Sequence, residues 1–231
     1  MGVLYMANKA SVIIPAYNEE KNIVKVIKML KNYKSEIIDE IIVVDNASTD
    51  NTNRLASNAG AIVLKCDDKG KGYAMERGLK YANNEIIVFL DADINNYTNN
   101  LVEILTAPII DKNADFVKSM FERKGGRVTE LVAKPLLDIL FPNMYKFSQP
   151  LSGMIAGKKS YFEKIEFEKD YGVDIGILLD MLNLGAKVEE VYIGKINNSS
   201  HSWLSLEKMS KEVMTAILKR KNSILGGFEN E

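Results

Sequence analysis

The first half of the chain alternates short apolar runs with longer stretches in which apolar residues recur every three or four positions. The runs are strand-sized and rich in Val and Ile, whereas the longer stretches have the period of an amphipathic helix, as in Ile23, Val26 and Leu30. The pattern predicts strands at residues 11–15, 40–45, 61–66 and 85–90, and helices at residues 19–33 and 73–81. Strands that alternate with helices are typical of an α/β fold with a mainly parallel sheet.

The second half contains the same kinds of segment in a less regular order. We predict strands at 115–121 and 188–193, a short apolar segment at 154–156, and helices at 128–140, 173–184 and 204–219. No linker, repeat or low-complexity stretch interrupts the pattern, so residues 1–231 are predicted to form one domain. Within it, about residues 1–97 form a nucleotide-binding half and about residues 98–231 an acceptor-binding half.

The composition is that of an ordinary globular protein, with 46% hydrophobic and 26% charged residues. Lys and Arg number 30 against 31 Asp and Glu, so a net charge of -1 provides no overall field for nucleic acid or an anionic membrane. No apolar run approaches the ~20 residues of a membrane-spanning helix, and the N-terminus lacks a signal-peptide pattern. The single cysteine, Cys66, suits a reducing compartment, so a cytoplasmic protein is expected.

Ligands of an open parallel sheet bind beyond the carboxyl ends of its strands, so the residues after each strand are the first candidates for chemistry. The first strand runs into Pro15-Ala16-Tyr17-Asn18-Glu19-Glu20 and the second into Asp45-Asn46-Ala47-Ser48-Thr49-Asp50. Helix capping explains much of both segments as well as ligand binding does. Asp45 and Asn46, however, lie at the strand edge, where a base or a ribose can be held.

A third strand end carries Asp91-Ala92-Asp93 after an entirely apolar run. Two carboxylates at the mouth of a buried strand provide hard oxygen ligands for Mg²⁺ or Mn²⁺. Such an ion bridges the phosphates of a nucleotide and neutralises the charge that grows on a departing diphosphate. A divalent metal site is therefore expected at this strand end.

Two glycine-containing segments precede predicted helices. In Lys69-Gly70-Lys71-Gly72 the glycines let backbone N–H groups approach a phosphate, and Lys71 supplies charge. In Gly126-Arg127-Val128-Thr129 a guanidinium and a hydroxyl join the backbone donors of a helix start. Taken alone, the first segment is better explained as an ordinary solvated turn, and the second as an ordinary helix start with a solvated Arg127.

The three strand-end segments together resemble the nucleotide-sugar glycosyltransferases of family 2, which have the GT-A fold, a Rossmann-like α/β sheet flanked by helices. The resemblance implies that Lys71 approaches the diphosphate and that Asp91 and Asp93 belong to the metal and sugar-nucleotide site. With Asp45 added from its strand-edge position, the residues expected to bind the nucleotide-sugar are Pro15, Ala16, Asn18, Glu19, Asp45, Asn46, Lys71 and Asp91.

The second half resembles a narrower group, the glucosyl-3-phosphoglycerate synthase family. The matching segments are Lys118-Ser119 and residues 126–137, 149–153 and 171–176. This resemblance implies metal-dependent transfer of glucose from an NDP-glucose, usually UDP-glucose, to 3-phosphoglycerate, with retention at the anomeric carbon.

The same resemblance implies roles for residues of the second half. Gly126, Arg127 and Thr129 match the loop that binds the phosphate of the acceptor. Asp174 stands where the family has Glu and is expected to hold sugar hydroxyls, and His201 is expected to complete the metal site beside Asp93. Asp91, Asp93, Lys71 and Asp174 are thus the expected catalytic residues.

Three other functions remain open from the residues alone. They are a family 2 enzyme with a different acceptor such as a polyprenyl phosphate, a nucleotidyltransferase, and a non-catalytic sugar-nucleotide-binding module. The amphipathic segment 204–219 is expected to pack on the domain or to form a homodimer, because Glu207 and Glu212 interrupt any basic face that would bind a membrane.

Overall fold

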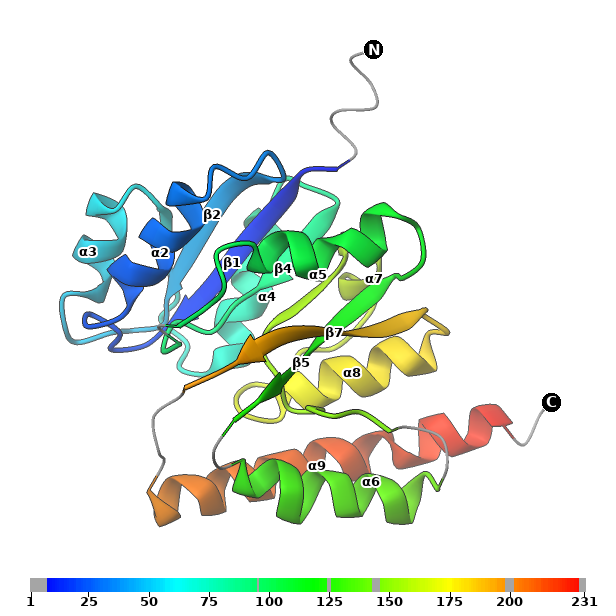
Figure 1. Ribbon diagram of the computed structural model, residues 1–231. Helices are drawn as coiled ribbons and strands as arrows, with labels where there is room; N and C mark the ends of the chain where they lie inside the picture. Colours follow the sequence, from blue (N-terminus) through cyan, green and yellow to red (C-terminus); the bar gives the residue numbers. More distant parts are fainter. Residues whose placement is uncertain (1–7, 95, 124–125, 143–145, 198–201, 229–231) are drawn as a thin grey trace.

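A single seven-stranded sheet organises the protein (Figure 1). The computed structural model describes residues 8–94, 96–123, 126–142, 146–197 and 202–228, the last seven as backbone alone. Across the sheet the strands follow the order β3-β2-β1-β4-β6-β5-β7. Their bounds are β1 Ala10–Ala16, β2 Ile38–Asp45, β3 Ile62–Lys65, β4 Ile86–Phe89, β5 Phe116–Glu122, β6 Ile155–Lys158 and β7 Val188–Lys195.

The sheet is mainly parallel, as the sequence predicts. β1 pairs in parallel with β2 and β4, β2 with β3, and β5 with β7. The exception is β6, which is antiparallel to both β4 and β5. This strand occupies the short apolar segment expected at 154–156, and it inserts between two strands that precede it in the chain.

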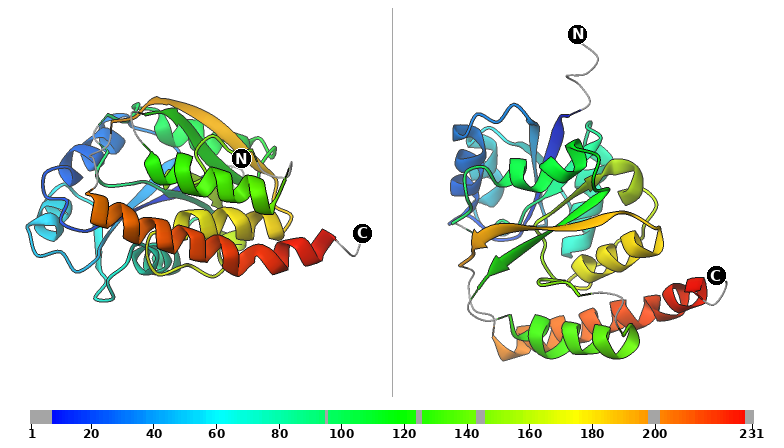
Figure 2. Two further views of the ribbon diagram at one scale, coloured as in Figure 1. Left: turned by 90° about the horizontal axis from the view of Figure 1, so that it is seen from below. Right: turned by 45° about the vertical axis from the view of Figure 1, so that its right-hand side comes forward.

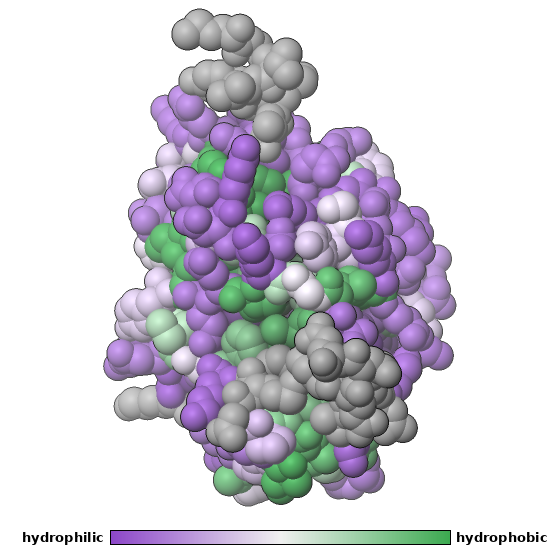
Figure 3. All heavy atoms as spheres, turned by 90° about the vertical axis from the view of Figure 1, so that its right-hand side faces the viewer, coloured by the Kyte–Doolittle hydropathy of each residue, from purple (hydrophilic) through white to green (hydrophobic). Residues whose placement is uncertain are grey.

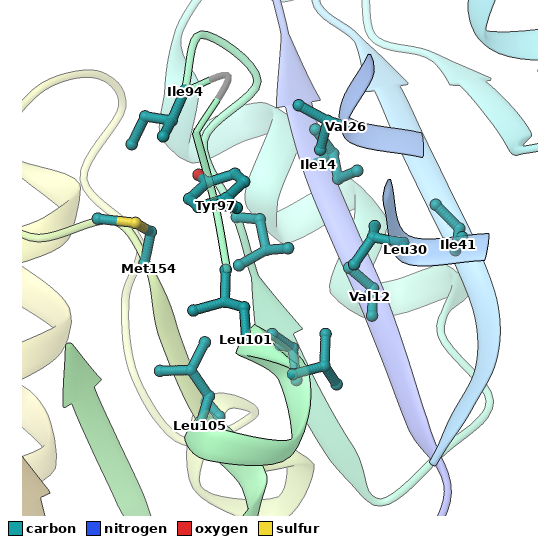
Figure 4. Close-up of a cluster of buried hydrophobic side chains, with 14 of the residues drawn as sticks. Val12, Ile14, Val26, Leu30, Ile41, Ile94, Tyr97, Leu101, Leu105 and Met154 are labelled. Carbon is teal, nitrogen blue, oxygen red and sulfur yellow. The ribbon is translucent and has the colours of Figure 1, made fainter. Parts of the chain in front are cut away.

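Helices cover both faces of the sheet (Figure 1). Side chains of α2 (Ile23–Asn32), α3 (Thr52–Asn58) and α5 (Leu101–Ile110) belong to the core on one face. The opposite core takes side chains from α4 Lys71–Tyr81, the π-helix η1 Thr129–Ala133, α6 Lys134–Leu140, α7 Lys159–Phe162, α8 Val173–Asn183 and α9 Trp203–Phe228. Successive residues of a strand point to opposite faces, so Val12 and Ile14 of β1 enter the first core (Figure 4). Ile13, between them, enters the second core.

Each predicted helix is present in the structure, but several of the predicted bounds are wrong. α2 begins at Ile23, not at residue 19, because residues 19–22 form a turn closed by Asn22 N–H donating to Glu19 O at 3.0 Å. α3, α5 and α7 were not predicted. α3 and α7 are short, and α5 is apolar around most of its circumference, so none of them shows a clear one-sided period.

The helix predicted at 128–140 contains an irregular turn. Its first turn begins at Arg127 and continues as η1 before α6. Pro135 lacks the N–H that would donate to a carbonyl four residues earlier, and a π-helical turn is a common way for a helix to absorb such a gap. The turn begins at Thr129, the last of the expected acceptor residues.

The last helix, α9, lies beside α6 and beneath α8 (Figures 1 and 2). Arg220 of α9 is 5% exposed and donates from Nε and Nη2 to the two carboxylate oxygens of Asp180 in α8, at 2.7 and 2.8 Å. Its Nη1 donates to Glu168 Oε1 at 2.6 Å. None of the helices in the described ranges is both long and apolar enough to cross a membrane.

Replacing Arg220 by Met should lower the free energy of unfolding by about 3 kcal/mol, because it leaves the largely buried Asp180 without its paired cation and Glu168 with Lys219 alone. Urea unfolding measures this loss. Lys211→Met is the matched control: its pair with Glu207 is exposed, so it should cost less than about 1 kcal/mol. Equal losses for the two variants would contradict the role given to Arg220.

Candidate active site

A cavity of about 850 Å³ opens at the carboxyl ends of β1 and β4. It extends along the starts of α4 and α8 to one side of α9. The expected site residues that line it are Pro15, Ala16, Glu19, Asn46, Lys71, Asp91, Asp93, Gly126, Arg127, Thr129 and Asp174. Residues expected to bind the nucleotide-sugar, the metal and the acceptor thus share one cavity.

Lys71 joins the two halves of the chain at the floor of this cavity. Its ammonium lies 2.9 Å from Asp91 Oδ1 and 2.9 Å from Asp174 Oδ2. Burial opposes a charge on this amine, but the two carboxylates outweigh it and raise the pKa of Lys71 above its ordinary value. Lys71 therefore remains a fixed cation at the position where a diphosphate was expected.

The loop before α4 approaches two other segments closely. Asn46 accepts from Gly70 N–H at 2.7 Å and donates to Asp68 O at 2.6 Å, so the end of β2 fixes this loop. Gly72 N–H donates to Lys169 O at 3.0 Å, and a Cβ on Gly72 would collide with the carbonyl of Glu168. Gly72 is thus required by close backbone contact, which holds the N-terminus of α4 against the loop that precedes α8.

Glu19 and Tyr97 lie close enough to Asp91 and Asp93 for the two carboxylates to affect their ionisation. Burial raises the pKa of Glu19, and repulsion from Asp93 and Asp91 raises it further. A hydrogen bond from Asn22 partly opposes this increase. The phenol of Tyr97 donates a hydrogen bond to the backbone carbonyl of Asp91 at 2.8 Å. The pKa of Tyr97 is raised, mainly by burial and also by the negative charges of Asp91 and Asp93.

This excess of carboxylate charge is the environment that a divalent cation neutralises, so the residues present fit the expected Mg²⁺ or Mn²⁺. Asp93 would hold the ion with help from Asp91, one of whose oxygens already accepts from Lys71. His201, the other expected metal ligand, lies outside the described residues. Among the residues the structure describes, no three His, Cys, Asp or Glu side chains form a metal-binding group.

The expected acceptor residues lie at the start of the helix that leads into η1. The guanidinium of Arg127 stacks over the ring of exposed Trp203, with its carbon 5.0 Å from the ring centre. Thr129 is 1% exposed, and its hydroxyl accepts a hydrogen bond from Arg123 Nη2 at 2.6 Å. Neither Trp203 nor Arg123 was among the expected site residues. Arg123 could have been proposed from the sequence, because it lies three positions before Gly126 at the start of a predicted helix.

Two residues expected to bind the nucleotide-sugar do not line the cavity. Asn18 accepts from the backbone N–H of Thr49 at 2.8 Å, which joins the first and second strand-end loops. Asp45 accepts from Ser48 N–H at 3.1 Å and Asn53 Nδ2 at 3.0 Å. Both side chains shape the loops around the cavity, and their contact with a ligand remains a prediction.

Lys118 is a fully buried lysine beneath the cavity that the sequence named only as part of a matching segment. Its amine donates to Pro150 O at 2.9 Å and to Ser152 O at 2.7 Å. Burial lowers its pKa to about 8, although nearby Asp174 opposes the lowering. A neutral amine has two N–H donors, so both hydrogen bonds survive the loss of the third proton.

Lys118 should make the protein more stable as the pH rises from about 8. In that range the unfolded chain, with an ordinary lysine pKa of 10.5, still binds a proton that the folded protein has lost. The free energy of unfolding of the parent, compared with Lys118→Met, should therefore increase by up to about 1.4 kcal/mol per pH unit between pH 8 and 10. Urea titrations across this range measure the difference, and parallel profiles for the two proteins would contradict the lowered pKa.

The mainly parallel sheet, the paired carboxylates at a strand end and the lysine at a helix start define a nucleotide-sugar glycosyltransferase of the GT-A type. The chain matches glycosyl transferase family 2 over residues 11–165 and belongs to that family. The fold and the enzyme class expected from the motifs are confirmed.

Within this family the chain is similar to glucosyl-3-phosphoglycerate synthases. It is 34% identical to the synthase of Petrotoga mobilis, over 92% of this chain and 73% of the relative. The Mycobacterium tuberculosis synthase in complex with Mn²⁺, UDP-glucose and phosphoglyceric acid matches with a TM-score of 0.88 and 34% identity, over 95% of this chain and 81% of that one. The complex of the same enzyme with Mg²⁺ and UDP has a TM-score of 0.89, with the same identity and coverage.

Proposed function

We propose that this glycosyltransferase moves glucose from UDP-glucose to 3-phosphoglycerate and gives glucosyl-3-phosphoglycerate. The observation that carries the proposal is that one cavity joins the Lys71–Asp91–Asp174 cluster to the helix start with Arg127 and Thr129. A donor diphosphate and an anionic acceptor can therefore be held side by side. The similarity to synthases with these substrates supports the assignment.

The side chains of the cavity divide the work between donor and acceptor. Lys71 offers its charge to the diphosphate, and Asp174 lies next to it, close enough for its carboxylate to accept from sugar hydroxyls. A bound Mg²⁺ or Mn²⁺ at Asp93 and Asp91 would neutralise negative charge on the departing UDP. Arg127, Thr129 and the backbone at Gly126 would bind the acceptor phosphate.

Transfer with retention is proposed to occur on the face of the sugar from which UDP leaves. The acceptor hydroxyl oxygen forms the new bond to the anomeric carbon as the bond to the phosphate oxygen breaks, and that phosphate oxygen takes the hydroxyl proton. Both carboxylate oxygens of Asp174 accept hydrogen bonds from the Lys71 ammonium, Oδ1 at 3.0 Å and Oδ2 at 2.9 Å. This engagement disfavours Asp174 as a covalent nucleophile and favours direct transfer.

A donor-by-acceptor matrix tests the function. UDP-glucose, GDP-glucose and GDP-mannose are each incubated with 3-phosphoglycerate, a polyprenyl phosphate or no acceptor. A separate mixture contains UTP and glucose 1-phosphate, the substrates of a nucleotidyltransferase. Products are identified by mass spectrometry and NMR. We expect glucosyl-3-phosphoglycerate with the α configuration of the donor retained. A glycolipid, a new nucleotide-sugar with released pyrophosphate, or no turnover would each assign one of the other functions. Asp93→Asn serves as the inactive control.

Removal of divalent metal should abolish transfer, because the single charge of Lys71 cannot offset the negative charges of Asp91, Asp93 and the diphosphate. With excess EDTA we expect turnover to fall at least about a hundredfold, which corresponds to a loss of several kcal/mol of charge stabilisation. Adding Mn²⁺ or Mg²⁺ back should restore it. UDP release measures turnover, and an unchanged urea midpoint in EDTA excludes unfolding as the cause. Full turnover in the chelator would remove metal from the mechanism.

We also propose a homodimer formed through the surface of α6 and α9. Large apolar side chains are exposed there: Ile139 is 73% and Leu204 80% exposed, with Leu131 of η1 at 74%. In the side view of Figure 3, hydrophobic surface gathers at the lower end, the level at which these helices lie in Figure 1. Such a patch usually marks an interface. Light scattering should give the mass of a dimer, and Ile139→Lys should yield the monomer; a monomeric parent would contradict the proposal.

A reducing cytoplasm is the proposed location. Cys66 is buried and free, and its thiol donates to Asp68 O at 3.4 Å. Burial raises the pKa of this thiol, so it is mainly protonated at neutral pH and poorly reactive.

A further inference from the structure

Arg123 lies at the acceptor end of the cavity, in the segment after β5. Its guanidinium carbon is 5.5 Å from the centre of the Phe121 ring, and its Nη2 donates to the Thr129 hydroxyl at 2.6 Å. Burial lowers the pKa of Arg123 from its ordinary value, and the charges of Glu130 and Asp91 oppose the lowering. An arginine starts from a pKa above 12, so the group remains a cation at neutral pH.

No carboxylate pairs with Arg123 in the part of the chain that the structure describes; its hydrogen-bond partner there is the neutral Thr129. Arg220, the buried arginine of α9, instead has both Asp180 and Glu168 as counter-charges. A largely buried cation without a paired anion is costly unless an anion binds beside it. The cavity that Arg123 lines is the place from which such an anion can come.

The hydrogen bond from Arg123 also determines what Thr129 can do. A threonine hydroxyl has one proton to donate and two lone pairs. Arg123 occupies a lone pair, and no described residue accepts the Thr129 proton. Thr129 lines the cavity, so its proton is available there to an oxygen of a bound ligand.

Gly126 completes the link between Arg123 and the acceptor loop. Its φ of 83° lies in the left-handed region that favours glycine. A Cβ at this position would lie 2.8 Å from Arg123 Nε and 2.9 Å from Nη2. The loop at Gly126 therefore packs closely against the guanidinium, and its positive φ favours a residue without a side chain.

We propose that Arg123 is a positioning residue for the phosphate of the acceptor. It holds the Thr129 hydroxyl as a donor to a phosphate oxygen and supports the loop at Gly126. This inference rests on the proposed function and extends it: an acceptor with a phosphate dianion is preferred because Arg123 and Thr129 act on it as a pair.

A double-mutant cycle over Arg123→Met and Thr129→Val tests the pair. We expect Arg123→Met to raise the KM for 3-phosphoglycerate about tenfold or more, the loss that one charge-assisted hydrogen bond implies. The Kd for UDP and kcat should stay within about twofold of the parent. Because Arg123 acts through Thr129, the effect of Thr129→Val should be several-fold smaller in the Arg123→Met background. Arg54→Met, which removes an exposed arginine from α3, is the matched control and should change neither constant.

Each other outcome is decisive. Additive effects of the two substitutions, or an unchanged KM in Arg123→Met, would overturn the proposal. If Arg123→Met fails to fold, Arg123→Lys is used in its place. Lysine keeps the positive charge but lacks the planar guanidinium, so the KM for 3-phosphoglycerate should rise by a smaller factor. An unchanged KM in Arg123→Lys would overturn the proposal. If the parent does not use 3-phosphoglycerate at all, the proposed function fails instead. Calorimetric binding of inorganic phosphate to parent and Arg123→Met then tests Arg123 by itself, and equal affinities overturn it.

Discussion

The arrangement of the active site depends on one interaction, the contact of Lys71 with Asp91 and Asp174. Asp91 follows β4 in the first half of the chain, and Asp174 lies in the first turn of α8 in the second half. Lys71, whose side chain is 21% exposed, stays charged because the two carboxylates outweigh the effect of burial on its amine. The ammonium in turn offsets the repulsion between the two carboxylates. The first and second halves of the chain are thus held together by Lys71, at the position where a diphosphate is expected.

This contact in turn requires the second half to be held firmly against the first. The loop before α8 accepts the Gly72 N–H through Lys169 O, and α9 secures the same loop from behind. Arg220 pairs with Glu168, and Glu212 accepts from Tyr171 N–H at 2.8 Å. The C-terminal helix, although far from the strands of the first half in sequence, therefore supports the start of α4, where Lys71 lies.

The sequence predicted the central strands β1 and β4 to within one residue at each end, because a strand buried on both faces must be continuously apolar and its end is marked by a polar loop. The same strand ends supplied the candidates Asn46, Asp91 and Asp93, all of which line the cavity. Asn18 and Asp45 show the limit of that reasoning. A polar side chain at a strand end can turn to a ligand or to a neighbouring loop, and the residue type is the same in both cases.

The local pattern of the chain therefore determined the α/β class, the parallel half of the sheet and the loops that carry chemistry. Tertiary structure alone decided that β6 inserts antiparallel between β4 and β5, and that Arg123 reaches Thr129. It also decided that Lys118 lies buried beneath the cavity with a lowered pKa. The physical reason is range: hydrophobic periodicity and capping act over a few neighbouring residues, whereas strand order, burial of a charge and the pairing of distant side chains depend on the packing of the whole chain.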